Sequence, residues 1–147
     1  MNKPIAVLFA GTVLLAGAVH AQDAQDPATA VATAVAAATD SATRWLAIAD
    51  AGKWDDSWEQ VAPSAQSMVG KSAWHVSLSA ARTPLGEVKS RKLQSASFTH
   101  TLPGAPAGDY VVIQYATDFA NKPQSVETVV PMRLPDGSWK VSGYFVR

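Results

Sequence analysis

Two carboxylates, Asp118 and Glu127, are the first candidates for chemistry in this sequence of 147 residues. They lie in neighbouring stretches of alternating apolar and polar residues, which predict adjacent antiparallel strands. The expected pairing places both carboxylates on one sheet face, two positions apart on the diagonal. Such a pair can act as acid and base if burial separates the two pKa values. The alternative, which we favour, is that both lie on a solvated sheet face.

The tripeptide Gly70-Lys71-Ser72 is similar to the end of a phosphate-binding loop. That motif needs a glycine five positions before its second glycine, where this chain has Ala65, and a strand before the loop. The residues before Gly70 predict a helix instead of a strand. The better interpretation is that another helix begins at Ser72.

The histidines and serines form no recognisable metal or nucleophile motif. Beyond residue 21 the chain has His75 and His100 and no cysteine, so a zinc site would need carboxylates from distant segments. No Gly-x-Ser-x-Gly elbow surrounds a serine in the sequence. We therefore expect no metal and no cofactor, with His75 on a helix surface and His100 on a strand near a loop.

Basic residues are concentrated in the segment RTPLGEVKSRK, which contains Arg82, Lys89, Arg91 and Lys92. The preceding region, 23–59, is acidic. This asymmetry could bind an anionic envelope polymer or form a partner surface, and the alternative is a set of separately solvated charges. Over the whole sequence, 12 Lys and Arg balance 12 Asp and Glu, which argues against a nucleic-acid-binding protein.

The first 21 residues, MNKPIAVLFAGTVLLAGAVHA, have the pattern of an export signal. Lys3 precedes an uncharged apolar run over 5–18, and Val19-His20-Ala21 has the small-x-small pattern that signal peptidase cleaves. The run is shorter than the roughly 20 residues of a membrane-spanning helix. Lipid attachment would need a cysteine, which the sequence lacks. We therefore predict cleavage after Ala21 and a soluble periplasmic or secreted protein, without membrane span or lipid anchor.

The first part of the remaining chain predicts three helices. An Ala- and Thr-rich leader over 22–39 passes into a helix whose apolar stripe recurs at three- and four-residue steps and ends at Gly52. A short helix begins near Asp55 or Asp56, and a third helix covers about 72–82. These helices are expected to pack on one face of the sheet that follows.

From Glu87 onward the hydrophobic period changes to alternation, which predicts strands. Turn signals divide this region into four strands of an antiparallel meander. We expect a bulge near Gln94, where the alternation slips, and a bulge or break at Pro131, which has no N–H for the ladder. The result is one α+β domain over 40–147.

The expected register decides which side chains enter the core. A four-residue turn after Phe119 pairs Tyr115 with Thr128, and the last turn pairs Thr128 with Phe145. The apolar face then includes Phe145 and four residues of the third strand, namely Val126, Thr128, Val130 and Met132.

Large aromatic side chains of the helices and the sheet are expected to meet in one layer. Core packing is the first interpretation, and a small-molecule pocket at the wide end of a curved sheet is the second. In such a pocket the Tyr115 hydroxyl would orient a ligand, because a buried hydroxyl needs a partner. The residues expected around the pocket are Tyr115, Phe119, Trp139, Trp74 and Trp58.

Four phrases together resemble a bacterial family of small exported proteins, the domain of unknown function 4019 (DUF4019). They are WLAIADAGKWDDSW, RTPLGEVKSRKL, LPGAPAGDYVVIQYATDFANKPQSVETV and DGSWKVSGYFVR, and the resemblance covers 39–147. It implies helices followed by a curved sheet, similar to the cystatin or NTF2-like cone. The family supplies no activity and no catalytic residues, and a shared shape does not assign a function.

Three classes of function stay open. We favour an exported soluble accessory or binding module, without catalysis, that recognises a small molecule or an envelope partner. The second is a cone-fold enzyme with a pocket between helices and sheet. The third is a protein whose sheet edge takes up a strand of a partner. A deep pocket with an ionisable group would indicate the enzyme, and an uncovered regular edge would indicate strand addition.

Overall fold

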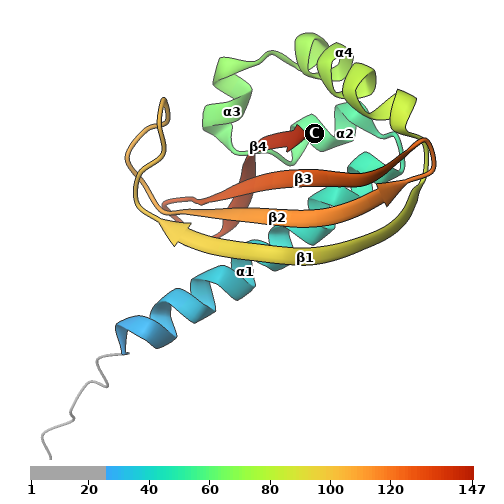
Figure 1. The fold of residues 1–147 in the computed structure, drawn as a ribbon. Helices are drawn as coiled ribbons and strands as arrows, with labels where there is room; N and C mark the ends of the chain where they lie inside the picture. Colours follow the sequence, from blue (N-terminus) through green and yellow to red (C-terminus); the bar gives the residue numbers. More distant parts are fainter. Residues whose placement is uncertain (1–25) are drawn as a thin grey trace, which may run out of the picture.

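The computed structural model describes residues 26–147, so the predicted export signal lies outside the described residues. Helices come first and strands follow, as Figure 1 shows. The elements are α1 (Pro27–Asp50), α2 (Trp54–Glu59), α3 (Pro63–Met68), α4 (Lys71–Arg82), a 3-10 turn (Thr83–Leu85), β1 (Val88–Thr99), β2 (Tyr110–Phe119), β3 (Lys122–Arg133) and β4 (Trp139–Val146). The predicted α+β class is confirmed. There is one more α-helix than predicted, because Pro63 begins a helix, a position that suits proline.

The helix α1 contributes buried side chains to one side of the hydrophobic core. Asp26 caps it by accepting a hydrogen bond from the Ala28 N–H, and Pro27 takes its first position. Its N-terminal half projects beyond the sheet in Figure 1. The buried residues lie in its C-terminal half at three- and four-residue steps: Ala38, Ser41, Ala42, Trp45, Leu46 and Ala49.

The four strands form one antiparallel sheet in the order β1-β2-β3-β4, which confirms the predicted meander. The β1–β2 register shifts between Leu93 and Ser95, at the bulge expected near Gln94. The β3–β4 register shifts between Val130 and Pro131, as expected for a residue that cannot donate to the ladder.

The predicted register of β2 with β3 is wrong by one residue. Tyr115 lies opposite Glu127 and not opposite Thr128. The turn is shorter than expected, because Phe119 already pairs with Lys122. A slip of one residue exchanges the two faces of a strand. Glu127 therefore points into the core and is fully buried, while Thr128 is only half-buried.

The predicted pairing of Thr128 with Phe145 is confirmed, but the predicted burial of Phe145 is wrong. In the observed register of β3, both residues lie on the sheet face opposite α1. Phe145 is 65% exposed there. Its neighbour Tyr144 points to the core side instead, where its ring centroid lies 5.2 Å from that of Trp45.

The hydrophobic core lies between α1 and the inner face of the sheet. Side chains of α1 pack there against β2, β3 and β4, and Val61, Ala65 and Leu78 join from the later helical region. In Figure 1, α2, α3 and α4 form an arc around the end of β4. Within residues 26–147, no helix is long and apolar enough to cross a membrane.

Candidate functional site

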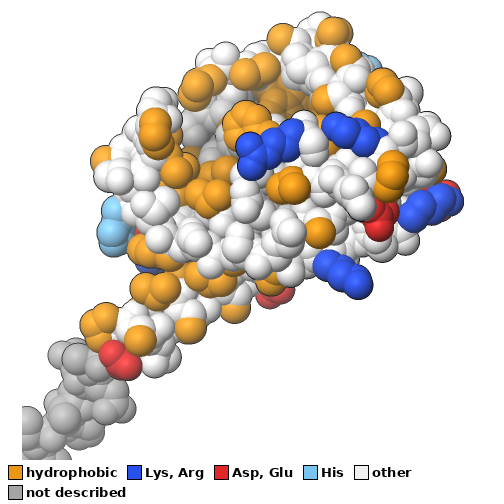
Figure 2. Space-filling model, in the orientation of Figure 1, with side chains coloured by type: hydrophobic (Ala, Val, Ile, Leu, Met, Phe, Trp, Pro, Cys, Tyr) orange, Lys and Arg blue, Asp and Glu red, His pale blue; other side chains and the backbone are white. Residues whose placement is uncertain are grey.

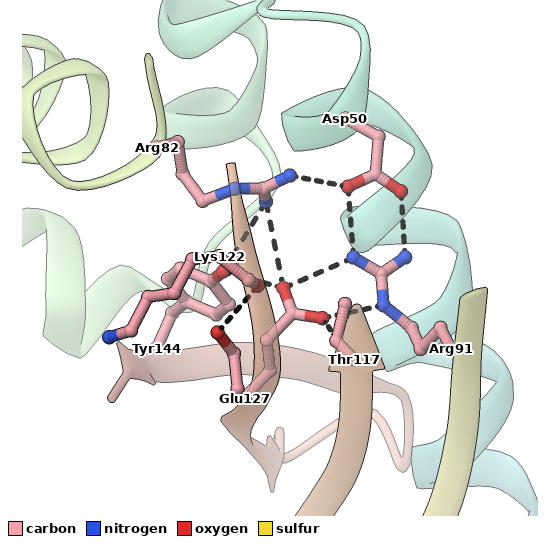
Figure 3. A network of polar contacts seen from close by, with 8 residues as sticks. Asp50, Arg82, Arg91, Thr117, Lys122, Glu127 and Tyr144 are labelled. Atoms are coloured by element: carbon pink, nitrogen blue, oxygen red, sulfur yellow. Dashed lines mark hydrogen bonds and ion pairs between the residues drawn. The ribbon is translucent and has the colours of Figure 1, made fainter. Parts of the chain in front are cut away.

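An interior network of charged residues surrounds Glu127 of β3 (Figure 3). Glu127 is fully buried and accepts hydrogen bonds from the hydroxyls of Thr117 and Tyr144, both at 2.6 Å. Arg91 of β1 donates to the same carboxylate through Nε at 2.6 Å and through Nη2 at 3.1 Å. Donors from all three other strands therefore converge on one carboxylate.

Asp50, the last residue of α1, completes the network. Arg91 donates to its two oxygens at 2.7 and 2.9 Å, and Arg82 of α4 donates to it at 2.7 Å. Arg82 Nη1 also lies 3.7 Å from Glu127 Oε1. Two carboxylates thus balance two guanidinium groups, and the network joins α1 and α4 to every strand of the sheet.

Burial and pairing set the protonation of these groups. Burial alone would raise the pKa of Asp50, but the hydrogen bonds from Arg91 and Arg82 outweigh it and hold that pKa below its ordinary value. Burial and the charge of Glu127 raise the pKa of Tyr144. The Tyr144 hydroxyl therefore keeps its proton and acts as a donor to Glu127.

The geometry of the network suits a structural role. Both oxygens of Glu127 are occupied, and only 4% of the Arg82 side chain and none of Glu127 is exposed, so a substrate does not reach them. The Arg82 guanidinium lies 5.0 Å from the centre of the Phe119 ring, which offers it a cation–π contact. Separating these elements would leave uncompensated charges in the interior, which is costly, so the pairing favours the observed arrangement.

Asp50 should make stability depend on pH in the acid range. Its folded-state pKa lies below the ordinary value of 3.8, so the unfolded state takes up the proton first as the pH falls. Its contribution is complete above about pH 5 and is lost as the pH falls through the two pKa values. The difference in unfolding free energy between wild type and Asp50→Asn, measured in urea, should be constant above about pH 5 and shrink below about pH 4. A difference that stays the same at about pH 3 would contradict this assignment.

The four residues expected to form a basic patch do not share a surface. Arg82 and Arg91 lie in the interior network, because the end of α4 and the inner face of β1 meet there. Lys89 is exposed and pairs with Glu87 at 2.7 Å, and Lys92 is exposed separately.

The structure does not bring Asp118 and Glu127 together, since they lie on opposite sheet faces. Asp118 is exposed and accepts hydrogen bonds from the Gln124 N–H at 2.7 Å and from Ser90 at 3.1 Å. Gln124 has a left-handed backbone with φ of 56°. Asp118 therefore holds the start of β3 in place, and the Gln124 bond lowers its pKa.

The aromatic residues expected around a pocket are mostly sealed in the core. Tyr115, Phe119 and Trp139 are buried, with 6%, 2% and 9% of their surface exposed. Among residues 26–147, the Tyr115 hydroxyl has no hydrogen-bond partner, and its burial raises its pKa. Trp58 and Trp74 pack against the core from the helical side. Trp74 also borders a surface hollow described below, and Trp139 borders two other surface hollows.

His75 lies on the surface of α4 as predicted, whereas His100, expected on a strand, lies just beyond the end of β1; each is beside one carboxylate. His75 of α4 contacts Asp55 at 2.7 Å, and His100, just after β1, contacts Asp109 at 2.8 Å. No group of three or more metal-ligating side chains occurs in the part of the chain that the structure describes.

An apolar hollow of about 310 Å³ lies on the sheet face that carries Phe145. Val112, Val130 and Phe145 contribute to its floor, and Met68 of α3 and the loop 102–106 form its sides. Met68 is 75% exposed. Large apolar side chains therefore meet the solvent on both sides of this hollow.

A second apolar hollow, of about 390 Å³, lies on the other side of Phe145, between α4 and the end of β4. In Figure 2, hydrophobic side chains gather in the hollowed region inside the arc of α3 and α4. The lining residues are Val69, Trp74, Ser77, Leu78, Ala81, Tyr144, Phe145 and Val146. We name the two hollows together the Phe145 site. Sequence reasoning missed it because the longer turn expected after Phe119 placed Phe145 in the core.

Comparison with known proteins supports one assignment. The family model described as protein of unknown function (DUF4019) matches residues 41–144. The comparisons with curated proteins and with solved structures found no match. The matched residues include the second half of α1, the later helices and almost the whole sheet. The chain therefore belongs to the DUF4019 family.

Proposed function

We propose that this protein is an exported, soluble binding module without catalytic activity, and that it takes an apolar ligand or partner segment at the Phe145 site. The observation that carries the proposal is the exposure of Phe145 and Met68, at 65% and 75%, beside two apolar hollows. Exposed apolar surface of this kind marks binding sites in proteins that are otherwise well packed.

The dimensions and chemistry of the site support binding. Each hollow, at about 310 and 390 Å³, lies at the lower end of the range of small-molecule and peptide sites. Covering one Phe side chain that is exposed to water contributes about 1.5–3 kcal/mol. The Tyr144 ring borders the site while its hydroxyl bonds to Glu127, so the network fixes one wall of the site.

Replacing Phe145 with serine should weaken the binding of an apolar probe. The mature protein is titrated with N-phenyl-1-naphthylamine, an uncharged dye whose emission rises in apolar surroundings. Loss of the Phe145 ring should raise the dissociation constant at least about fivefold, equivalent to about 1 kcal/mol of apolar contact.

The matched control for this titration is Val76→Ser. Val76 is also a large exposed apolar residue, at 64%, but it does not line either hollow of the Phe145 site. The control should bind the dye as wild type does. Absence of saturable binding to wild type, or equal weakening in both variants, would contradict the proposed function.

We also propose that the protein works in the periplasm or outside the cell. The support is the pattern of Lys3, the apolar run 5–18 and the small residues up to Ala21. Terminal sequencing of the protein recovered from the envelope or the medium should begin at Gln22. A mature protein that still carries Met1 would show that the segment is not a cleaved signal.

A further inference from the structure

The outer edge of β4 is closed along its first half. The carbonyl of Val141 accepts a hydrogen bond from the Ala62 N–H at 2.8 Å, at the connection between α2 and α3. The carbonyl of Trp139 accepts one from the Ser41 hydroxyl of α1 at 2.7 Å. Another strand is therefore kept away from this part of the sheet.

The second half of the same edge is open. Arg147 and Val126 exchange two backbone hydrogen bonds, at 2.8 and 3.1 Å, which identifies them as a hydrogen-bonded pair of the ladder. Because such pairs alternate, the N–H and C=O of Phe145 point to β3, and those of Tyr144 and Val146 point outward. Within residues 26–147, neither Tyr144 nor Val146 has a backbone hydrogen bond to an element outside the sheet.

The open half-edge faces the hollow between β4 and α4. Trp74, Leu78 and Ala81 line the α4 side of this hollow, opposite Tyr144 and Val146. Unpaired backbone groups thus lie next to apolar side chains with space between them. This combination suits a ligand that offers both a polar backbone and apolar side chains.

The two edges of the sheet differ in the features that prevent strand pairing. The β1 edge carries exposed Lys89 and Lys92 and a bulge near Gln94, features by which proteins discourage pairing. The open part of β4 reads Gly-Tyr-Phe-Val over 143–146 and has no charged side chain. Only the β4 edge therefore has the character of a pairing surface.

From this juxtaposition we infer that the Phe145 site binds an extended polypeptide segment of a partner protein, which adds to β4 as a fifth strand. The segment pairs with the N–H and C=O groups of Tyr144 and Val146. Its side chains on one face enter the hollow beside α4, and those on the other face cover Phe145 and Met68. Alternate residues of the segment are therefore apolar. This inference rests on the proposed function and specifies its ligand.

A second copy of the folded chain does not fit this edge. The end of β4 lies inside the arc of α2, α3 and α4 (Figure 1). In a second copy the same helices surround its own β4, so they would collide before the two edges came within the 4.7–4.9 Å of paired strands. An extended segment without flanking helices enters this space.

The test begins with selection of peptides by the mature protein from a phage-displayed library of random twelve-residue peptides. Selected peptides should have apolar residues at alternate positions. A series of synthetic analogues, each with one N-methylated amide, removes backbone donors one at a time. N-methylation should weaken binding at least about tenfold at every second position and less than about twofold between them, as expected for a strand paired on one side.

A pair of variants at Val146 tests the protein side of the same contact. Val146→Pro removes the outward backbone N–H and leaves the bonds to β3 intact. Val146→Thr keeps this backbone N–H and has a side chain of similar shape. The proline variant should lose peptide binding at least about tenfold, while the threonine variant binds within about threefold of wild type. If the proline variant does not fold, the N-methyl series still decides.

Dye and peptide together separate the two proposals. If the dye binds saturably but no peptide is enriched, strand addition is wrong while the proposed binding function is retained. The same holds if N-methylation weakens peptide binding equally at consecutive positions. Concentration-dependent dimers with slow amide exchange at Tyr144 and Val146 would also overturn it, since a second copy would then occupy the edge. Loss of dye binding itself would instead contradict the proposed function.

Discussion

Replacing Glu127 with alanine is expected to lower the free energy of unfolding by about 3–5 kcal/mol. Glu127 is fully buried and is the shared acceptor for Arg91, Thr117 and Tyr144. Its removal leaves the guanidinium of Arg91, whose side chain is 16% exposed, without one of its two counter-charges. Asp50 alone then faces the two guanidinium groups of Arg82 and Arg91, and most of the loss comes from this excess interior charge and not from the value of the pair itself.

Urea denaturation at neutral pH measures this change, with Glu87→Ala as the matched control. Glu87 also pairs with a cation, Lys89, but both side chains are exposed, so the control should unfold at nearly the same urea concentration as wild type. Glu127→Gln keeps an acceptor for Tyr144 but removes the charge, and its loss should lie between the other two. A loss below about 1 kcal/mol for Glu127→Ala would show that the network does not hold the fold together.

Deleting residues Tyr144 to Arg147 is expected to unfold the protein. The deletion removes the Tyr144 ring from its contact with Trp45, the Tyr144 hydroxyl from Glu127, and the paired backbone of Arg147 with Val126. Loss of one buried aromatic side chain costs about 3–5 kcal/mol, and a domain has only about 5–15 kcal/mol of stability. Circular dichroism during heating should show no cooperative transition, and a melting temperature equal to that of wild type would contradict the placement of β4.

Two point substitutions separate the contributions of neighbouring residues in that segment. Tyr144→Ala should cost about 3–5 kcal/mol because its ring faces the core. Phe145→Ala should cost about 1 kcal/mol or less, because 65% of Phe145 is exposed. A larger loss of unfolding free energy for Phe145→Ala than for Tyr144→Ala would contradict the observed register. It would favour the longer turn after Phe119, with Phe145 on the buried face of the sheet and Tyr144 on the exposed face.

The sequence alone determines the features of the fold that depend on residues close together in the chain. The apolar stripe of α1, the change to alternation near Glu87 and the breaks near Gln94 and Pro131 all follow from local periodicity or from proline chemistry, and the structure has each of them. The family was also recognisable from four ordered phrases, and the matching family model covers residues 41–144.

Only the tertiary structure decides which face each strand buries and which charges meet. The turn at Ala120-Asn121 is two residues shorter than expected, and the irregularity between Thr117 and Phe119 offsets one of them, so the register moves by one position. This exchanges Glu127 with Thr128 and exposes Phe145. The hydrogen-bonded ion pairs of Asp50 and Glu127 join residues 32 to 41 positions apart. The local sequence pattern predicts that a charged residue is exposed to solvent, because the pattern contains no information on binding partners that lie on other helices or strands. The interior network and the Phe145 site both arise from that long-range packing.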